Sequence, residues 1–130
     1  MTLITIKRFL LLIFTLSILG CSSVPLKSPS HVVGFKESGK ASFYAMKYQS
    51  RKTASGERFD QFSKTAAHKK LPFGTKVKVT NVKNGKSVVV KINDRGPFVK
   101  GRIIDLSRSA FEAIGNTDSG VIDVTIEVVK

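Results

Sequence analysis

The chain contains 130 residues, and with 22 basic against 9 acidic side chains its formal net charge at pH 7 is +13. This length is enough for one compact domain and too short for two. The single cysteine excludes an internal disulfide, and the excess of positive charge predicts an acidic partner or surface.

The first 20 residues have the pattern of an export signal. Lys7 and Arg8 precede an uncharged, mostly apolar run over residues 9–19, which is too short to span a bilayer comfortably. The sequence from Ile18 to Cys21 resembles the lipobox of bacterial lipoproteins, in which the cysteine becomes the lipid-modified first residue. We therefore expect residues 1–20 to be a lipoprotein signal peptide and Cys21 to carry a membrane anchor. An ordinary cleaved signal and an uncleaved anchor are the alternatives.

Export from the cytoplasm also limits which binding partners and which cellular location are expected for the protein. Ser22 follows the cysteine where an Asp would signal retention in the inner membrane, so we expect a periplasm-facing lipoprotein of the outer membrane. Residues 21–38 hold two prolines, several serines and little periodicity, which predicts a flexible tether before a domain over residues 39–130. Outside the cytoplasm the basic surface argues for anionic lipid headgroups or peptide carboxylates and against nucleic acid. A solvated surface explains many of the lysines equally well.

Most of the predicted elements are strands. Residues 40–44 form a short candidate, and residues 75–82 alternate valine with lysine, which is typical of a half-buried strand. Asn84-Gly85 is a hairpin turn signal because both residues tolerate positive φ. Residues 87–92 return as the partner strand, where three consecutive valines predict burial on both faces. Residues 122–128 alternate without a break and predict the last strand.

One or two short helices complete the pattern. Ser107 is a candidate N-cap for a helix that runs to Ile114 and is closed by Gly115, and residues 65–69 are a candidate for a further helical turn. Short strands, small helices and Gly-rich turns are typical of a small β-barrel.

Several polar segments carry residues that a barrel does not need. Their ionisable side chains are Glu57, Asp60, His68, Asp94, Arg95, Arg102 and Asp105. Each residue alone has an ordinary structural explanation. Carboxylates in a loop balance nearby cations, and a lone histidine usually caps a helix or packs in the core. An aspartate in a turn or before a helix accepts hydrogen bonds from backbone N–H groups. Two carboxylates and two guanidinium groups around Gly96-Pro97, just after a valine-rich strand, instead indicate a site that supplies a positioned acid.

Taken in order, the motifs resemble one family. They are Gly39–Tyr44, Thr53–Glu57, Thr65–His68, Leu71–Thr75, Val79–Asn81, Asn93–Phe98 and Asp105–Ser107. Their order and spacing resemble the rare lipoprotein A family of septal-ring lytic transglycosylases over residues 39–129. The resemblance implies a mostly β fold, a six-stranded double-psi β-barrel with one or two short helices. The Asp105–Ser107 segment is also similar to the barrels of expansins and of a cellulase family.

The resemblance further implies an endolytic enzyme of the cell envelope. Such an enzyme cleaves the bond between N-acetylmuramic acid and N-acetylglucosamine in peptidoglycan glycan strands, and leaves 1,6-anhydro ends because the sugar's own 6-hydroxyl replaces water. Division-machinery proteins are possible further partners, and no cofactor is implied. An expansin-like module that binds and loosens peptidoglycan without cutting it is the alternative, and a structural envelope lipoprotein is a third class.

Carried over by position, Asp94 is the first candidate for the catalytic acid and base, and Asp105 is the second. His68 would orient or share the proton, and Glu57 with Asp60 would complete the cluster. The acid needs a raised pKa, which partial burial or a neighbouring negative charge provides.

The remaining candidate residues are expected to bind the substrate. Arg95 and Arg102 would hold the carboxylates or a substrate carboxylate, since a guanidinium stays charged and binds bidentately. Tyr44 offers a face for sugar stacking, with burial in the barrel as the alternative. The chain has two histidines, one of them outside the predicted domain, and no thiol remains once Cys21 is lipidated, so no metal site is expected.

Overall fold

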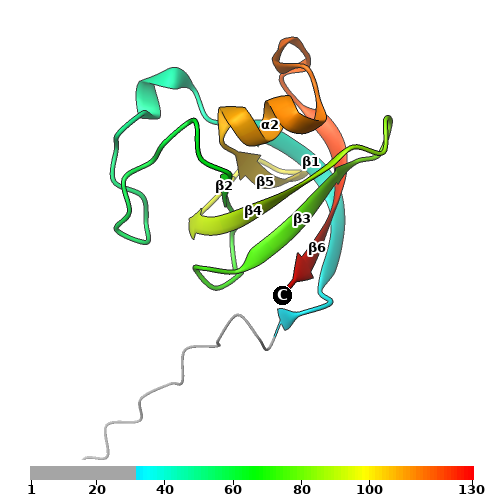
Figure 1. Ribbon diagram of the computed structural model, residues 1–130, viewed down its shortest axis with the longest axis horizontal. Coiled ribbons are helices and arrows are strands. Elements are labelled where there is room, and N and C mark those ends of the chain that lie inside the picture. Colours follow the sequence, from blue (N-terminus) through cyan, green and yellow to red (C-terminus); the bar gives the residue numbers. More distant parts are fainter. Residues whose placement is uncertain (1–31) are drawn as a thin grey trace, which may run out of the picture.

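The computed structural model describes residues 32–130, which form a closed barrel of six strands (Figure 1). The strands are β1 (Lys36–Phe43), β2 (Thr65–Ala67), β3 (Lys76–Asn81), β4 (Ser87–Asp94), β5 (Arg102–Leu106) and β6 (Ile122–Val129). Their order around the barrel is β1-β5-β2-β4-β3-β6, and β6 closes on β1. The pairs β1–β5 and β2–β4 are parallel, and the other neighbours are antiparallel. The expected six-stranded, mostly β fold is confirmed.

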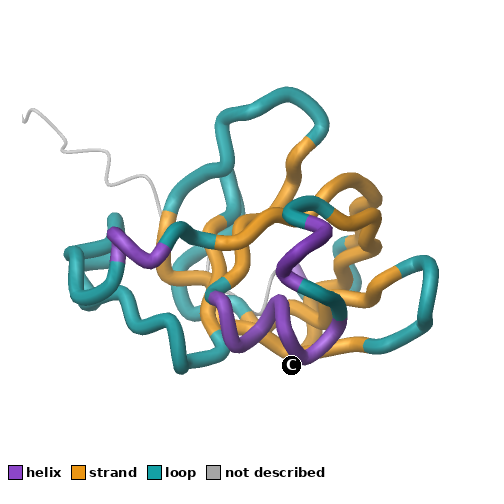
Figure 2. Tube along the Cα trace, turned by 90° about the horizontal axis from the view of Figure 1, so that it is seen from above, coloured by secondary structure: helices purple, strands orange, loops and turns teal. Residues whose placement is uncertain are grey.

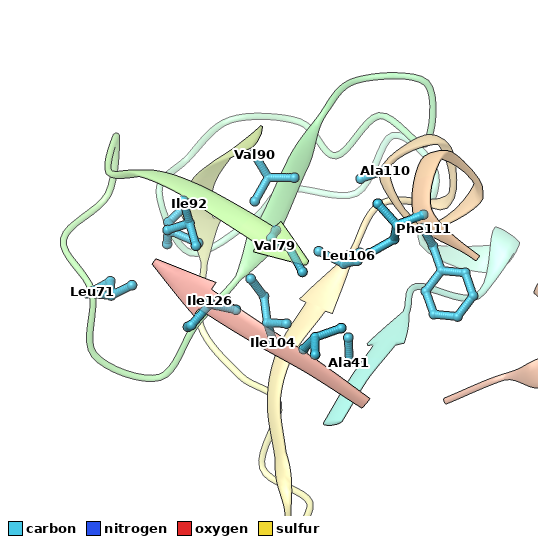
Figure 3. Close-up of a cluster of buried hydrophobic side chains, with 14 of the residues drawn as sticks. Ala41, Leu71, Val79, Val90, Ile92, Ile104, Leu106, Ala110, Phe111 and Ile126 are labelled. Atoms are coloured by element: carbon cyan, nitrogen blue, oxygen red, sulfur yellow. The ribbon is translucent and has the colours of Figure 1, made fainter. Parts of the chain in front are cut away.

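The core fills the inside of this barrel (Figure 3). Alternate residues of β3, β4 and β6 point inward because successive side chains of a strand face opposite ways. Val79, Val90, Ile92 and Ile126 are buried there, each 1% exposed or less. Burial of such aliphatic side chains contributes about 1.5–3 kcal/mol each and holds the strand ends in fixed positions.

The helix that the sequence predicts after Ser107 is α2 (Arg108–Ile114). The Ser107 side chain accepts a hydrogen bond from Ala110 N at 3.4 Å, and Gly115 N donates to Phe111 O at 2.9 Å, so both predicted ends are confirmed. The helix packs against the barrel, mainly against β4 and also against β1 and β5 (Figure 1). Two 3₁₀ turns, η2 (Met46–Tyr48) and η3 (Thr117–Ser119), complete the regular structure of the described residues.

The prediction of a helical turn over residues 65–69 is wrong. Residues 65–67 form strand β2, which pairs with β4 on one side and β5 on the other. Backbone hydrogen bonds to the two neighbouring strands determine the conformation of so short a segment, whatever the intrinsic helix or strand propensity of its residues. The prediction that all three valines of β4 are buried is wrong as well, because Val89 is 48% exposed while Val90 lies inside.

The barrel also begins earlier than expected. Residues 36–38, which the sequence assigns to the tether, belong to β1 and pair with residues 125–127 of β6. Their side chains are polar or charged and give no alternating pattern, so only the backbone pairing defines this part of the strand. The predicted signal peptide, Cys21 and the tether up to residue 31 lie outside the described residues. From Val32 to Lys130 no helix is long and apolar enough to cross a membrane.

The predicted β3–β4 hairpin is confirmed, with a longer turn than a two-residue one. Residues 82–86 connect the strands, and Gly85 alone among them has positive φ, at 72°. Asn84 instead accepts a hydrogen bond from Lys86 N at 2.9 Å through its side-chain oxygen. The turn signal therefore identified the place of the reversal correctly and its geometry only in part.

Candidate active site

Four residues form one row across the outside of the barrel, on strands β1, β5, β2 and β4. Ser42 lies opposite Asp105, and Ala67 lies opposite both Asp105 and Asp94. Directly opposed residues project from the same face of a sheet, so the two carboxyl groups flank the small Ala67 side chain. Neighbouring strands are about 4.8 Å apart, which places the backbones of the two aspartates about 10 Å apart.

An irregularity in the β2–β4 pairing brings Asp94 into this row. Ala66 pairs with Ile92, but Ala67 pairs with Asp94, so Asn93 has no partner in the ladder. Since a shift of one residue exchanges the two faces of a strand, regular pairing would place Asn93 in the row and turn Asp94 away from it. The bulge is therefore the feature that exposes this carboxyl group beside Asp105.

The Asp94 carboxylate is held by donors from three segments. Tyr44 Oη donates to Asp94 Oδ2 at 2.5 Å, while Ala54 N and Arg95 N each donate to Oδ1 at 2.9 Å. Burial, followed by the bond to Asp94, raises the pKa of Tyr44 far above its usual value, so the phenol remains the donor. The Tyr44 ring packs on Phe59 with centroids 4.3 Å apart. The residue predicted as a sugar platform thus fixes the orientation of the first candidate acid.

Asp105 has a different environment. Its Oδ1 accepts a hydrogen bond from Ser42 Oγ at 3.1 Å. Burial raises its pKa above the usual value and outweighs the opposing effects of the Ser42 bond and the Arg102 charge, and the negative charge of Asp94 raises it further. Arg102 acts on this carboxyl through its charge, as an arginine near an acid does.

The segment between β1 and β2 is mostly a long loop (Figures 1 and 2). It reaches the end of β4, where Ser55 N donates to Asn93 O at 3.2 Å. Gln61, which is 1% exposed, anchors it: its Nε2 donates to Tyr44 O at 3.0 Å and to Ala45 O at 3.1 Å, and its Oε1 accepts from Arg108 N at 2.9 Å. The Arg108 bond satisfies a first-turn N–H of α2 that has no partner within the helix. One buried amide therefore ties the loop to β1 and to the helix.

Glu57 and Asp60 lie on this loop and face the outer end of β4. Both Glu57 oxygens are 3.0 Å from Lys91 Nζ, and the hydrogen bond from Lys91 lowers the pKa of Glu57. Asp60 accepts hydrogen bonds from Phe62 N, Gln49 Nε2 and Ser63 Oγ, at 3.0, 3.3 and 3.0 Å. These bonds lower the pKa of Asp60, and the bond from the Phe62 backbone has the largest effect. Asp60 thus shapes the loop, while Glu57 is open to solvent and paired with a lysine.

His68 makes its side-chain contacts elsewhere. Its Nδ1 accepts from Lys70 N and Leu71 N, both at 3.1 Å, and its Nε2 is 3.1 Å from Glu37 Oε1. Two accepted bonds at Nδ1 place the proton of the neutral ring on Nε2, where it is donated to Glu37. The imidazole faces a cavity of about 520 Å³ that Phe35 and Ile103 also line. Only its backbone reaches the carboxylate row, through a bond from His68 N to Asp94 O at 3.2 Å.

Arg95 also turns away from the carboxylates. Its Nη1 donates to His68 O at 3.3 Å and to Leu71 O at 2.8 Å, and its guanidinium lies 4.0 Å over the Phe73 ring. These contacts fix the segment after β2 against the turn after β4. Apart from the backbone N–H that binds Asp94, Arg95 has no hydrogen bond to either aspartate.

Sequence reasoning missed three residues of this region. Ser42 and Gln61 are common polar residues whose partners are distant in sequence, so nothing local marks them. Lys91 follows three valines for which the sequence predicts burial on both faces, so neither its outward direction nor its pairing with Glu57 was predictable. Across residues 32–130, no group of three or more His, Cys, Asp or Glu side chains is placed to hold a metal ion. The arrangement suits proton transfer by paired carboxyl groups.

Comparison with known proteins shows the family to which the chain belongs. A double-psi β-barrel family described as lytic transglycolase matches residues 36–126. The chain is 59% identical over 92 residues to the probable endolytic peptidoglycan transglycosylase RlpA of Synechocystis sp., covering 71% of this chain and 29% of that protein. It is 54% identical over 104 residues to the endolytic peptidoglycan transglycosylase RlpA of Vibrio cholerae, covering 80% of this chain and 38% of that protein. The chain thus spans about a third of the length of these relatives.

Solved structures show the same fold. A Streptomyces papain inhibitor superposes with a TM-score of 0.62 and 26% identity over 75% of this chain and 97% of its own. An expansin of Clavibacter michiganensis superposes with a TM-score of 0.59 and 24% identity over 74% of this chain and 51% of its own, and is evidence for the fold alone. The resemblance seen in the sequence motifs is confirmed: the chain belongs to the lytic transglycolase family of double-psi β-barrel proteins, together with the RlpA transglycosylases.

Proposed function

We propose that this protein is an endolytic peptidoglycan lytic transglycosylase, which cuts the bond between N-acetylmuramic acid and N-acetylglucosamine. The observation that carries the proposal is the row in which Asp94 and Asp105 flank Ala67 on the outside of the barrel. Family membership and the names of the relatives support the same activity.

The chemistry requires one carboxyl group to act twice. As a carboxylic acid it gives its proton to the glycosidic oxygen, and the bond from that oxygen to the anomeric carbon breaks. As a carboxylate it then takes the proton of the 6-hydroxyl, whose oxygen bonds to the anomeric carbon and closes the anhydro ring. Because the nucleophile belongs to the substrate, the second carboxyl group need not activate water.

We assign the acid and base to Asp94. Three donors fix the orientation of its carboxyl group, and general acid–base catalysis needs a positioned group. Asp105 is close enough for the two charges to interact, and the negative charge of Asp94 raises the pKa of Asp105. Asp105 is the second candidate, because its burial favours the protonated form.

The other predicted residues take supporting roles. Tyr44 positions Asp94, and Glu57 lies on the loop that also binds Asp94 through Ala54 N. His68 and Arg95 hold the segment that follows β2, and so position the backbone beside Asp94. Asp60 stabilises the loop that carries Glu57. Arg102 remains available to interact with Asp105 or with an acidic group of the substrate.

The test is incubation of the purified full chain with peptidoglycan sacculi, followed by mass spectrometry of the soluble products. We expect muropeptides or glycan fragments that end in 1,6-anhydro-N-acetylmuramic acid. Sacculi that are bound and sedimented with the protein but never cut would instead establish the expansin-like binding module. Sacculi that are neither bound nor cut would favour a structural envelope lipoprotein.

We also propose that the protein acts in the cell envelope as an outer-membrane lipoprotein, anchored through Cys21 and exposed to the periplasm. The lipobox-like sequence before Cys21 supports this placement. Replacing Cys21→Ser should move the protein from the membrane fraction to the soluble fraction and abolish labelling by a clickable fatty acid. A Ser22→Ala variant is the matched control and should stay in the membrane. Division-machinery partners are proposed on the family resemblance alone, and a pull-down from dividing cells tests them.

A further inference from the structure

A small cleft beside the carboxylate row is lined by an unusual set of side chains. Its volume is about 280 Å³, and it is formed by Glu57, Arg58, Asp60, Ser63, Lys64, Thr65, Lys76, Lys91 and Asn93. We name it the basic cleft, because four of these side chains are cationic and two are anionic. The proposed activity gives the four cations no role.

Two lysines of the basic cleft are placed where the fold alone disfavours them. Lys76 of β3 lies directly opposite Lys91 of β4. Side chains of directly opposed residues share one face with Cβ atoms about 5 Å apart, and like charges there are destabilising. Lys91 is paired with Glu57, but Lys76 makes no ion pair within the described residues. Arrangements that break a local rule of stability are concentrated at functional sites.

A second observation in the same cleft is independent of charge. Thr65 lies opposite Lys91 in the β2–β4 pairing and is 8% exposed. Its Oγ1 is buried and has no hydrogen-bond partner among the described residues. A buried hydroxyl without a partner costs about 1–3 kcal/mol, so it requires an explanation. A ligand oxygen entering the cleft would supply the missing bond.

The position of the basic cleft connects it to the carboxylate row. Thr65 and Ala67 are two residues apart on β2, so the two rows are about 7 Å apart along the strand. Glu57 and Asn93 line the cleft, and Asn93 directly precedes Asp94. A glycan strand whose scissile bond lies at Asp94 would therefore place a neighbouring sugar and its substituents over the basic cleft.

We infer that the basic cleft binds a carboxylate of the glycan strand next to the bond that is cut, between the Lys76 and Lys91 ammonium groups and the Thr65 hydroxyl. This inference rests on the proposed function for its substrate. Charge-assisted hydrogen bonds from ammonium groups are the strong ones, and the hydroxyl donates a third. Two sources carry such a carboxylate: the lactyl group of a peptide-free muramyl residue, or the peptide attached to that group.

Binding of the substrate carboxylate also changes the ion pair between Glu57 and Lys91. In the free protein Lys91 holds both Glu57 oxygens at 3.0 Å. A substrate carboxylate that takes a share of Lys91 weakens this pair and leaves the Glu57 charge less strongly neutralised. Recognition of the acidic substituent is thereby coupled to the electrostatics of the site.

The test measures binding without turnover, on full-length protein that carries Asp94→Asn so that strands stay intact. Three probes are compared by isothermal titration: peptide-free muramyl oligosaccharides, the same oligosaccharides with lactyl carboxylates converted to amides, and peptide-bearing oligosaccharides. In this background Lys76→Gln and Thr65→Val are compared with Lys86→Gln, which removes one exposed charge at the hairpin, the opposite end of the β3–β4 ribbon (Figure 1).

We expect Lys76→Gln to raise the Kd of a carboxylate-bearing probe about 10-fold and to reduce its salt dependence, with a smaller effect of Thr65→Val. The amidated probe should bind wild type and variant alike, and Lys86→Gln should change nothing. The Tm of Lys76→Gln should equal or exceed that of its parent, since the variant removes a repulsion. If peptide-free strands show the effect, the lactyl group is the ligand; if only peptide-bearing strands show it, the peptide is.

Equal weakening for the amidated probe, or no weakening for any probe, would overturn the inference. So would a fall in Tm that accounts for the weaker binding, because Lys76 would then be a structural residue. Loss of cleavage in the sacculus assay leaves this result unaffected, as binding is read separately. A protein that binds the carboxylate through Lys76 and yet forms no anhydro ends would contradict the proposed activity alone.

Discussion

The hydroxyl of Tyr44 is the contact whose removal tests the site most selectively. Tyr44→Phe deletes one atom, the donor of the 2.5 Å bond to Asp94 Oδ2, and keeps the ring on Phe59. A hydrogen bond to a charged group contributes about 1.5–3 kcal/mol. Taking the lower figure, because Asp94 keeps two other donors, we expect a loss of about 1.5 kcal/mol and a fall in Tm of about 6–12 °C.

The same loss should appear in catalysis if Tyr44 orients Asp94 in the transition state. About 1.4 kcal/mol corresponds to one factor of ten, so kcat should fall about 10-fold with little change in KM. The assay is release of anhydro-ended fragments from sacculi, together with thermal unfolding. Tyr48→Phe is the matched control, since the Tyr48 hydroxyl makes no hydrogen bond within residues 32–130 and its ring packs edge-on against Tyr44 at 6.0 Å. Equal kcat and Tm values for the two variants would refute the reasoning.

Two further predictions concern the stability of the site. Burial raises the pKa of Asp105 above its usual value of 3.8, so the folded state binds this proton more tightly than the unfolded state, and stability is lost as pH rises from the unfolded toward the folded pKa. Urea unfolding at pH 7 and at pH 3 should therefore show that Asp105→Asn is more stable than wild type at pH 7 but not at pH 3. A variant that is less stable than wild type at pH 7 alone would contradict the direction of the pKa shift. Gln61→Leu should lower the free energy of unfolding by about 3 kcal/mol, because the Arg108 N–H and the carbonyls of Tyr44 and Ala45 lose their partner. A loss below about 1 kcal/mol in the same assay would mean that water replaces the amide.

Prediction from the sequence succeeded where the side-chain pattern and the backbone pairing agree. The alternating residues of β3 and β6 and the capped helix α2 were found because their apolar positions repeat at the period of the element. It failed at the first part of β1 and at β2. Residues 36–38 are polar on both faces, and residues 65–67 are too few to show any period. Both segments are strands because neighbouring strands bind their backbones, which no local pattern records.

For the site, the motifs named Asp94 and Asp105 as candidates, but gave no sign that the two residues lie in one row. Their common row depends on the bulge that leaves Asn93 unpaired, and a change of one residue in register is invisible in a single sequence. The contacts of His68 are equally absent from the sequence pattern, since its partner Glu37 lies in the part of β1 for which the sequence predicts a tether. Candidate site residues were thus easier to name than their hydrogen-bond partners, because long-range strand pairing determines which residues meet.

The most direct test of the account compares wild type, Asp94→Asn and Asp105→Asn on sacculi by mass spectrometry, with folding of each variant verified by its Tm. We predict 1,6-anhydro ends from wild type and none above background from Asp94→Asn. Undiminished cleavage by Asp94→Asn, with loss of cleavage in Asp105→Asn, would transfer the acid to Asp105. Undiminished cleavage by both variants would contradict the claim that this row of carboxyl groups performs the reaction.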